Sequence, residues 1–437
     1  MRSAALVLLA LLSARPGVAA ETEARRASPT ERAPLVFVPG VTGSNLVRAR
    51  SGRIVWGTGW RLLLPRDGGR ALSLPIAPDA PAVEEPLVGG AVIRRMTLLF
   101  VSRAIYEPLF EALASAGYVE GDPAAPEPSA TFYPFGYDWR RETQTTAAAL
   151  DDLLARVARA RGRPEIDLAC QSNAARICRW VAKHGGRTLA EADSSSAPAR
   201  GYRIERLILI GASNGGAVRT LRELDRGRRY LPCGRRMTPE TLATMPSLIG
   251  DLPADAAGLF VDIEGRALDV DLYDAAEWLA RGWSIFGARS QKRLDAPARR
   301  RRFGAPADQL AALQGMLDRA RATHETLARD AAGFGSTALH LIVNESRPTP
   351  SRAVVRDSGR RRLLFAGDRA LRSDPELAGL VSEPGDGHAT ARSQRALSAQ
   401  ESAALAEVVA VDGGHFEVVL TVDLHRALLD MLERPVR

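Results

Sequence analysis

The chain has 437 residues, 46% of them hydrophobic, so it can bury a large core. Its net charge of +8 is more often the mark of a scattered, solvated surface, although it would also favour contact with anionic phospholipid surfaces. The sequence contains no zinc cluster, no Gly-rich nucleotide loop and no nucleic-acid-binding module. We therefore expect no metal, no cofactor and no nucleic-acid partner.

The N-terminus has the order of a secretory signal peptide. Arg2 precedes an apolar run from Ala4 to Leu12, and the small residues Val18-Ala19-Ala20 precede Glu21. The apolar run is too short to span a bilayer, so we predict a signal peptide at 1–20 and a periplasmic or secreted protein, with an uncleaved anchor as the alternative. Residues 21–33 are polar and predicted to be a flexible leader. Residues 34–437 are predicted to form one catalytic domain.

The predicted core begins with an apolar strand at 34–40, PLVFVPG, and a loop of small residues at 41–45. A strand ending in such a loop can bring a backbone N–H group beside a nucleophile, and Val41 and Thr42 are the candidate donors. Residues from about 47 to 100 are too long for a simple connection, and they indicate either a lid that meets lipid or a structural wrapper around the core. Helices are expected at 102–116 and 143–160.

A strand, a turn and a helix are predicted between Glu165 and Trp180, EIDLACQSNAARICRW. Ser172 stands on the turn, where a tight strand-to-helix connection pushes the hydroxyl out of the sheet. The backbone N–H of Asn173 faces the same space at a helix N-terminus. This is the pattern of a nucleophile elbow, and it predicts an α/β-hydrolase fold with a mostly parallel sheet and helices on both faces.

The three cysteines, Cys170, Cys178 and Cys233, allow at most one internal disulfide. Cys170 and Cys178 flank the elbow in the predicted strand and helix. We expect them to act as small buried hydrophobic residues.

The remaining predicted elements follow the elbow in chain order. A strand at 206–210 leads into Gly211-Ala-Ser-Asn-Gly-Gly216 and then into an insertion at about 217–335, which we predict to be a cap that shapes acyl-chain binding. The cap includes a helix from 307 to about 330. Further elements are strands at 338–343 and 407–411, a hairpin arm at 361–367 and a terminal helix at 417–433.

Two serines compete for the nucleophile. Ser213 lies in Gly211-Ala-Ser-Asn-Gly215, which matches the G-x-S-x-G pattern, whereas Cys170-Gln-Ser-Asn-Ala174 around Ser172 does not. The pattern uses glycines to avoid clashes around a strained turn, and Cys and Ala are small enough to be tolerated. Both serines follow a buried strand and precede an acid and a histidine. The residues alone therefore leave the choice open, although the spacing favours Ser213.

Four segments resemble the lecithin:cholesterol acyltransferase-like lipases and acyltransferases: PLVFVPGVTGSNL at 34–46, PFGYDWRRE at 134–142, GDGHATARS at 385–393 and DGGHF at 412–416. The resemblance covers most of the mature chain as separated islands. It implies that Ser172 is the nucleophile and that Ser213 is a loop residue near the cap. It matches Asp386 to the catalytic acid and His415 to the base, with Asp368 as the alternative acid.

In this interpretation His415 takes the Ser172 proton, and Asp386 orients the imidazole. The backbone N–H groups of Asn173 and Thr42 form the oxyanion hole. His388 is expected to line the site. The predicted function is an exported serine lipase or acyltransferase that acts on lipid esters, with transient membrane contact. The alternatives are a general esterase using Ser213, with Asp368 as its acid, and a catalytically inactive lipid-binding homologue.

Overall fold

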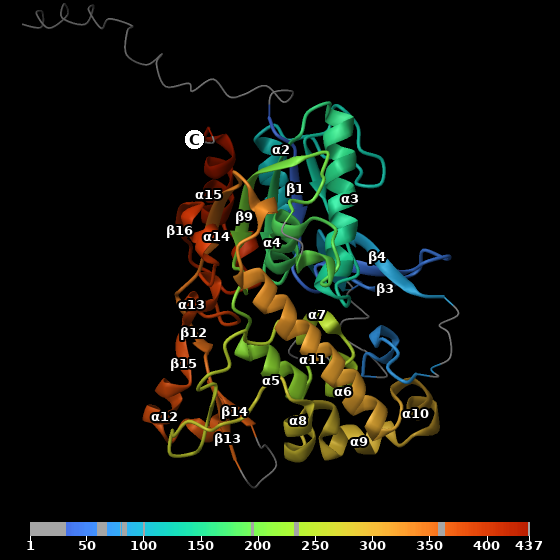
Figure 1. Ribbon diagram of the computed structural model, residues 1–437, viewed down its shortest axis with the longest axis vertical. Helices are drawn as coiled ribbons and strands as arrows, with labels where there is room; N and C mark the ends of the chain where they lie inside the picture. Colours follow the sequence, from blue (N-terminus) through green and yellow to red (C-terminus); the bar gives the residue numbers. More distant parts are fainter. Residues whose placement is uncertain are drawn as a thin grey trace, which may run out of the picture.

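The computed structural model describes residues 32–58, 68–78, 80, 85–98, 101–193, 196–230, 236–356 and 363–435. The predicted signal peptide, most of the leader and parts of the predicted lid lie outside these ranges. A central sheet of six strands has the order β16-β11-β9-β8-β1-β7, and every neighbouring pair is parallel (Figure 1). The strands are β1 (Leu35–Val38), β7 (Phe132–Pro134), β8 (Glu165–Gln171), β9 (Arg203–Ile210), β11 (Ala338–Val343) and β16 (Leu405–Ala410).

Apolar residues cover both faces of this sheet, as expected for a parallel sheet. Along β1, Val36 and Val38 belong to the core on one face, and Leu35 and Phe37 belong to the core on the other. The first core includes α3 (Thr143–Arg161) and α4 (Ala174–His184), and the second includes α2 (Glu107–Ser115) and α15 (Val422–Glu433). Alternating side chains therefore give three layers, helices on either side of one sheet.

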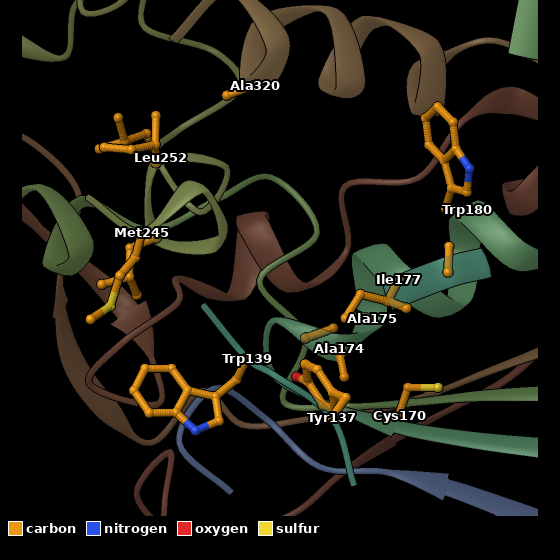
Figure 2. Packing of buried hydrophobic residues seen from close by; sticks show 14 of the residues in the cluster. Tyr137, Trp139, Cys170, Ala174, Ala175, Ile177, Trp180, Met245, Leu252 and Ala320 are labelled. Atoms are coloured by element: carbon orange, nitrogen blue, oxygen red, sulfur yellow. The ribbon is translucent and has the colours of Figure 1, made fainter. Parts of the chain in front are cut away.

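The elbow helix α4 packs against the first face of the sheet with a wholly buried surface. Its small residues Ala174 and Ala175 lie near the sheet, and Ile177 and Trp180 continue the apolar side (Figure 2). Its middle is held by a buried ion pair in which Arg179 donates to Glu401 at 2.7 and 2.6 Å. The ion pair thus ties α4 to the segment that carries Glu401.

The predicted lid region contains two small antiparallel sheets in the part that the structure describes. One has the order β3-β2-β4, and the other pairs β5 with β6. The predicted helix at 102–116 is wrong at its start, because Val101–Ala104 forms β6 and pairs with β5. The helix α2 begins only at Glu107, where Pro108 in its first turn favours a helix start. The bounds are β2 (Ser44–Arg48), β3 (Ile54–Trp56), β4 (Leu87–Val92), β5 (Arg95–Leu98) and the 3-10 turn η1 (Arg70–Leu72).

The segment between β9 and β11 is mainly helical and extends beyond the end of β9 (Figure 1). The long helix predicted at 307–330 is present as α11. The elements are α5 (Val218–Arg226), α6 (Pro239–Leu242), α7 (Pro246–Ile249), β10 (Phe260–Val261), α8 (Ala275–Arg281), η3 (Ser284–Phe286), α9 (Ala288–Leu294), α10 (Pro297–Phe303) and α11 (Pro306–Ala328).

The segment between β11 and β16 carries the predicted hairpin arm. In this arm β13 and β14 pair antiparallel, and residues 357–362 between these two strands lie outside the described ranges. The elements are β12 (Arg347–Pro350), β13 (Ala353–Val355), β14 (Leu363–Phe365), α12 (Pro375–Leu380), β15 (Ser382–Gly385), α13 (Ala391–Gln394) and α14 (Ala399–Ala403). Among the described residues, no helix is long and apolar enough to cross a membrane.

Candidate active site

Ser172 occupies the strained turn between β8 and α4. Its φ is +60°, a left-handed conformation that few residues other than glycine adopt. The turn is held because the Ser172 N–H donates to the carbonyl of Ile210 at 2.9 Å and the Ser172 carbonyl accepts from Ala175 at 3.0 Å. The strain and the sharp strand-to-helix connection are those of a nucleophile elbow.

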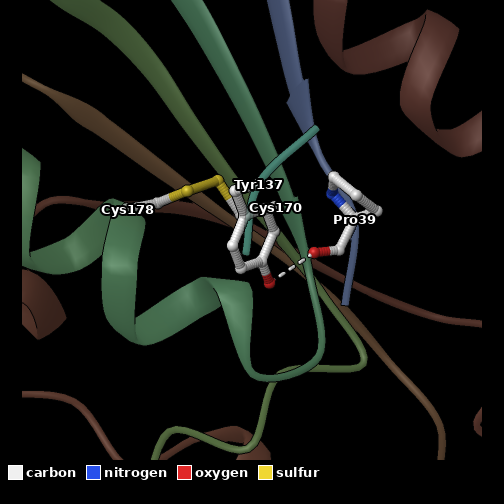
Figure 3. Close-up of a disulfide and its surroundings, with 4 residues drawn as sticks. All are labelled: Pro39, Tyr137, Cys170 and Cys178. Carbon is white, nitrogen blue, oxygen red and sulfur yellow. Dashed lines mark hydrogen bonds between the residues drawn. A yellow bond between two sulfur atoms is a disulfide. The ribbon is translucent and has the colours of Figure 1, made fainter. Parts of the chain in front are cut away.

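A disulfide joins Cys170 on β8 to Cys178 on α4 (Figure 3). The expectation that these cysteines act only as small buried hydrophobic residues is therefore wrong. The sequence could not show the pairing, because it depends on α4 folding back against β8. The disulfide closes a short loop that contains Ser172, and so it restricts the elbow from both sides.

The room that the elbow needs comes from a neighbouring loop. A Cβ atom on Gly40, at the end of β1, would lie 2.8 Å from Gln171 Oε1 and 3.0 Å from Ser172 Cβ. The first distance is shorter than real Cβ contacts, and the second is at their short limit, so a side chain here would force the loop to shift. Gly40 is therefore required for the close approach of the β1 loop to Ser172, although the elbow itself has Cys and Ala where the usual pattern has glycine.

The structure brings Ser172, His415 and Asp386 together in a buried chain of hydrogen bonds. Ser172 Oγ lies 2.7 Å from His415 Nε2, and His415 Nδ1 lies 2.6 Å from Asp386 Oδ2. Burial would raise the pKa of Asp386, but the charge and hydrogen bond of His415 outweigh it and hold that pKa below its usual range. Asp386 is thus a carboxylate that accepts a hydrogen bond from His415 Nδ1–H, which leaves His415 Nε2 able to accept the proton of Ser172.

Burial lowers the pKa of His415 below its usual value, although Asp386 opposes this effect. The imidazole is therefore neutral at pH 7, the state that a general base requires.

The Asp386 carboxylate is aimed by the turn in which it lies. Its Oδ1 accepts the backbone N–H groups of His388 and Ala389, both at 2.8 Å. The backbone of the same residue accepts the N–H of His415 at 2.9 Å. Thr349 supports this turn from β12, since its Oγ1 accepts the N–H of Gly387 at 2.8 Å. Asp386 thus has one oxygen held by the backbone and the other on His415.

Ser213 and Asp368, the alternative pair, lie in other surroundings. The Ser213 hydroxyl donates a hydrogen bond to the carboxylate of Asp251 at 2.5 Å. Among the described residues, no histidine is hydrogen-bonded to this hydroxyl. Asp368 accepts two hydrogen bonds from Arg226, each 2.6 Å long. The structure brings neither residue into contact with the other or with His415.

The loop after β1 supplies the first candidate oxyanion donor. Thr42 has a φ of +71°, and its backbone N–H donates to no acceptor within the described residues. The loop is held by the PFGYDWRRE segment, in which the Tyr137 hydroxyl donates to the Pro39 carbonyl at 2.9 Å (Figure 3) and the Trp139 indole donates to the Ser44 carbonyl at 3.2 Å. The backbone N–H of Asn173, at the N-cap of α4, has no acceptor in the described structure either.

Gln171 is a site residue that the sequence analysis missed. Its Oε1 accepts from the Gly40 N–H at 3.1 Å and from the Tyr106 hydroxyl at 2.6 Å, and its Nε2 donates to the His415 carbonyl at 3.3 Å. One buried amide thus ties the β1 loop, the elbow and the histidine loop together. Its position directly before Ser172 was the only available indication.

No group of three or more His, Cys, Asp or Glu residues in the described ranges is arranged to hold a metal ion. The chemistry that the site supports directly is nucleophilic, because a serine hydroxyl, a neutral imidazole and a carboxylate lie in line.

The sequence matches no protein-family model, and no curated protein is similar to it in sequence. Among solved structures, the chain resembles one titled "The crystal structure of Tle4-Tli4 complex", with a TM-score of 0.56 at 12% identity over 93% of this chain and 99% of the other. It also matches a lipase of Bacillus licheniformis, BlEst2 in mature form, with a TM-score of 0.35 at 11% identity over 92% of each chain. Identities this low bear on the fold alone.

The chain has an α/β-hydrolase fold. Its parallel sheet, its helices on both faces and its strained serine turn between a strand and a helix carry that assignment.

Proposed function

We propose that this protein is a serine lipase or acyltransferase that cleaves or transfers the acyl chains of lipid esters. The observation that carries the proposal is the continuous chain from Ser172 Oγ to His415 Nε2 at 2.7 Å and from His415 Nδ1 to Asp386 at 2.6 Å. The strained φ of Ser172 adds to it, since strain of this kind is concentrated at functional turns.

In the first half of the reaction Ser172 Oγ attacks the ester carbonyl carbon. His415 Nε2 takes the hydroxyl proton, and Asp386 stabilises the imidazolium that forms. The carbonyl oxygen becomes an oxyanion, for which the N–H groups of Thr42 and Asn173 are the proposed donors. One such donor is typically worth about 100- to 1000-fold in rate. His415 then returns the proton to the departing alcohol, and an acyl group remains on Ser172.

In the second half a water or an alcohol attacks the acyl-enzyme while His415 takes its proton, and His415 then returns that proton to Ser172 Oγ as the acyl–Oγ bond breaks. Water gives a free fatty acid, and an alcohol gives a new ester. The choice depends on how far the cap and lid exclude water.

Aromatic residues beside the site support an apolar ester as the substrate. Phe416 is 47% exposed, and its ring meets the His415 ring edge-on at 5.0 Å. The Trp56 indole donates to the Thr42 carbonyl at 3.1 Å, and Tyr230 packs on Trp56 with ring centroids 4.7 Å apart. An exposed aromatic ring next to the base and a pair of rings next to the oxyanion loop suit an acyl chain or a lipid surface.

Export is the proposed location, in the periplasm or outside the cell. The Cys170–Cys178 disulfide supports it, since disulfides persist mainly in oxidising compartments. The signal-peptide pattern at 1–20 points the same way. The resemblance of the four sequence segments to the lecithin:cholesterol acyltransferase-like enzymes supports the lipid ester class, and contact with membranes is proposed to be transient.

The test is turnover of dispersed phospholipid, triacylglycerol and sterol ester by the mature protein, with free fatty acid and transferred acyl product measured separately. Ser172→Ala should lower turnover by at least about 10⁴-fold, because the nucleophile is removed. Ser115→Ala, at an exposed serine on α2, is the matched control and should leave turnover unchanged. Equal turnover in the Ser172 variant and the wild type would contradict the proposal.

A further inference from the structure

A second imidazole is stacked on His415. The ring of His388 lies with its centroid 4.4 Å from that of His415, and the two planes are 28° apart. His388 is buried, with 6% of its surface exposed. Its Nε2 lies 3.0 Å from Asp251 Oδ2, and its Nδ1 has no partner among the described residues. The mechanism above uses neither His388 nor Asp251.

Asp251 is a strongly held carboxylate. It accepts hydrogen bonds from Arg176 at 2.8 Å, Ser213 at 2.5 Å and Thr220 at 2.6 Å. Burial alone would raise its pKa, but the hydrogen bond of His388 and the charge of Arg176 hold the pKa well below its ordinary range. Because Asp251 is ionised it can only accept, and so His388 Nε2 is the donor in their contact.

We propose that Asp251 and His388 form a positioning pair for His415. In this arrangement Asp251 fixes the orientation of the His388 ring, and the His388 ring fixes the plane of the His415 imidazole and tunes its basicity. This inference rests on the proposed function, since it gives His415 the role of general base.

The connections of His388 favour positioning over simple packing. Its backbone N–H donates to Asp386 Oδ1, so the turn that aims the catalytic acid also carries the ring stacked on the base. The two ring nitrogens of His415 are hydrogen-bonded to Asp386 and Ser172. These in-plane hydrogen bonds still allow the imidazole plane to tilt. The His388 ring, stacked on the face of the imidazole, restricts this tilting. A misplacement on the order of 1 Å at a reacting group can cost about 100-fold in rate.

The charges around His388 bear on the basicity of His415. The carboxylates facing it are Asp251, Asp386 and Glu223, and a positive charge on His388 lowers the pKa of His415. Arg176 contacts the same Asp251, Arg219 donates to the adjacent Gly387 carbonyl at 3.1 Å, and Arg228 pairs with Glu223 at 3.4 Å. Removal of the His388 nitrogens should therefore raise the pKa of His415.

Two substitutions separate stacking from charge. His388→Phe keeps a flat ring and removes the nitrogens, and His388→Ala removes both. His425→Ala is the control, because His425 is also buried but lies on α15 and contacts the Val419 carbonyl. Soluble p-nitrophenyl ester turnover is measured from pH 4 to 9 for each variant, with thermal unfolding as the check of folding.

We expect His388→Ala to lower kcat by about 10- to 100-fold with KM within about twofold, because the base is misaligned after substrate binds. His388→Phe should lose less kcat, and in both variants the acid limb of kcat/KM should move to higher pH. A folded His388→Ala variant with wild-type kcat and an unmoved acid limb would overturn the inference.

If the alanine variant does not fold, His388→Phe decides alone, and an unmoved acid limb overturns the inference. Wild-type turnover in Ser172→Ala would instead show that the proposed function fails.

Discussion

Ser172 and Ser213 follow two neighbouring parallel strands, yet their hydroxyl groups have different surroundings. Gln171 at the end of β8 pairs with Ile210 at the end of β9, so the two turns begin side by side. The hydroxyl of Ser172 meets an imidazole, and that of Ser213 meets the carboxylate of Asp251. Ser172 carries a positive φ, whereas in the second turn the positive φ values fall on Gly211 and Gly216.

Gly211 of the second turn lies close to the acid and the base of the first. A Cβ atom on Gly211 would lie 3.5 Å from Asp386 Oδ2 and 4.0 Å from His415 Nδ1. One of the two glycines of the Ser213 motif thus lies near the acid and base that meet Ser172. The backbone strain at Ser172 and its hydrogen bond to a histidine identify it as the nucleophile candidate. The G-x-S-x-G motif around Ser213 is a weaker indication.

The largest difference in turnover is expected between substitutions of Asp386, the acid paired with Ser172, and Asp368, the alternative acid. Asp386→Asn removes the carboxylate that fixes the His415 tautomer, and we expect kcat/KM to fall by about 10³- to 10⁴-fold. Asp368→Asn is the matched control, and it should weaken the Arg226 pair and lower stability while turnover stays near wild type. Ester hydrolysis and thermal unfolding of both variants are the measurements. A larger loss of turnover at Asp368 would reverse the assignment.

A smaller effect is expected where the β1 loop approaches the elbow. Gly40→Ala should lower kcat by about 10- to 100-fold, since its Cβ would push on Gln171 and Ser172 and displace the oxyanion loop. Gly201→Ala is a suitable control, because a Cβ there meets nothing within 4 Å. Steady-state kinetics measure the effect, and unchanged kcat in the Gly40 variant would mean that this loop does not contribute to turnover.

The pH profile sharpens the assignment of the base. His415 must be neutral to accept the Ser172 proton, and burial lowers its pKa below the usual 6.5. Activity should therefore persist as pH falls through 6.5 and be lost only when pH falls through the lowered pKa of the folded protein. The measurement is kcat/KM from pH 4 to 9. An acid limb centred above 6.5 would contradict the buried, neutral imidazole.

The smallest effect on turnover is expected at Ser213. Ser213→Ala removes one of several hydrogen bonds to Asp251, so turnover should fall by less than about tenfold. The free energy of unfolding should fall by about 1–3 kcal/mol, because a buried carboxylate loses a donor. Denaturant unfolding and ester hydrolysis test both parts. A loss of turnover equal to that of Ser172→Ala would mean that the two turns are not distinguished as described.

Much of the fold could be predicted because apolar runs mark its strands. The runs at 34–40, 166–170, 206–210, 338–343 and 407–411 each contain or overlap a strand of the sheet. The predicted start of α2 was wrong, because the spacing of apolar residues does not reveal that β5 pairs with β6.

The site was harder to predict from the sequence. The contact of Ser172 with His415 and Asp386 was expected only through resemblance. The roles of Gln171, Asp251 and the Cys170–Cys178 disulfide depend on residues far apart or folded back on one another, and no local pattern carries them.

The most direct test of the account is fluorophosphonate labelling of the purified mature protein, followed by peptide mapping of the modified serine. The account predicts that the label is on Ser172 and that Ser172→Ala abolishes labelling while Ser213→Ala retains it. Label on Ser213 would contradict the choice between the two turns, and no label on a folded sample would contradict an active serine site and favour a lipid-binding protein.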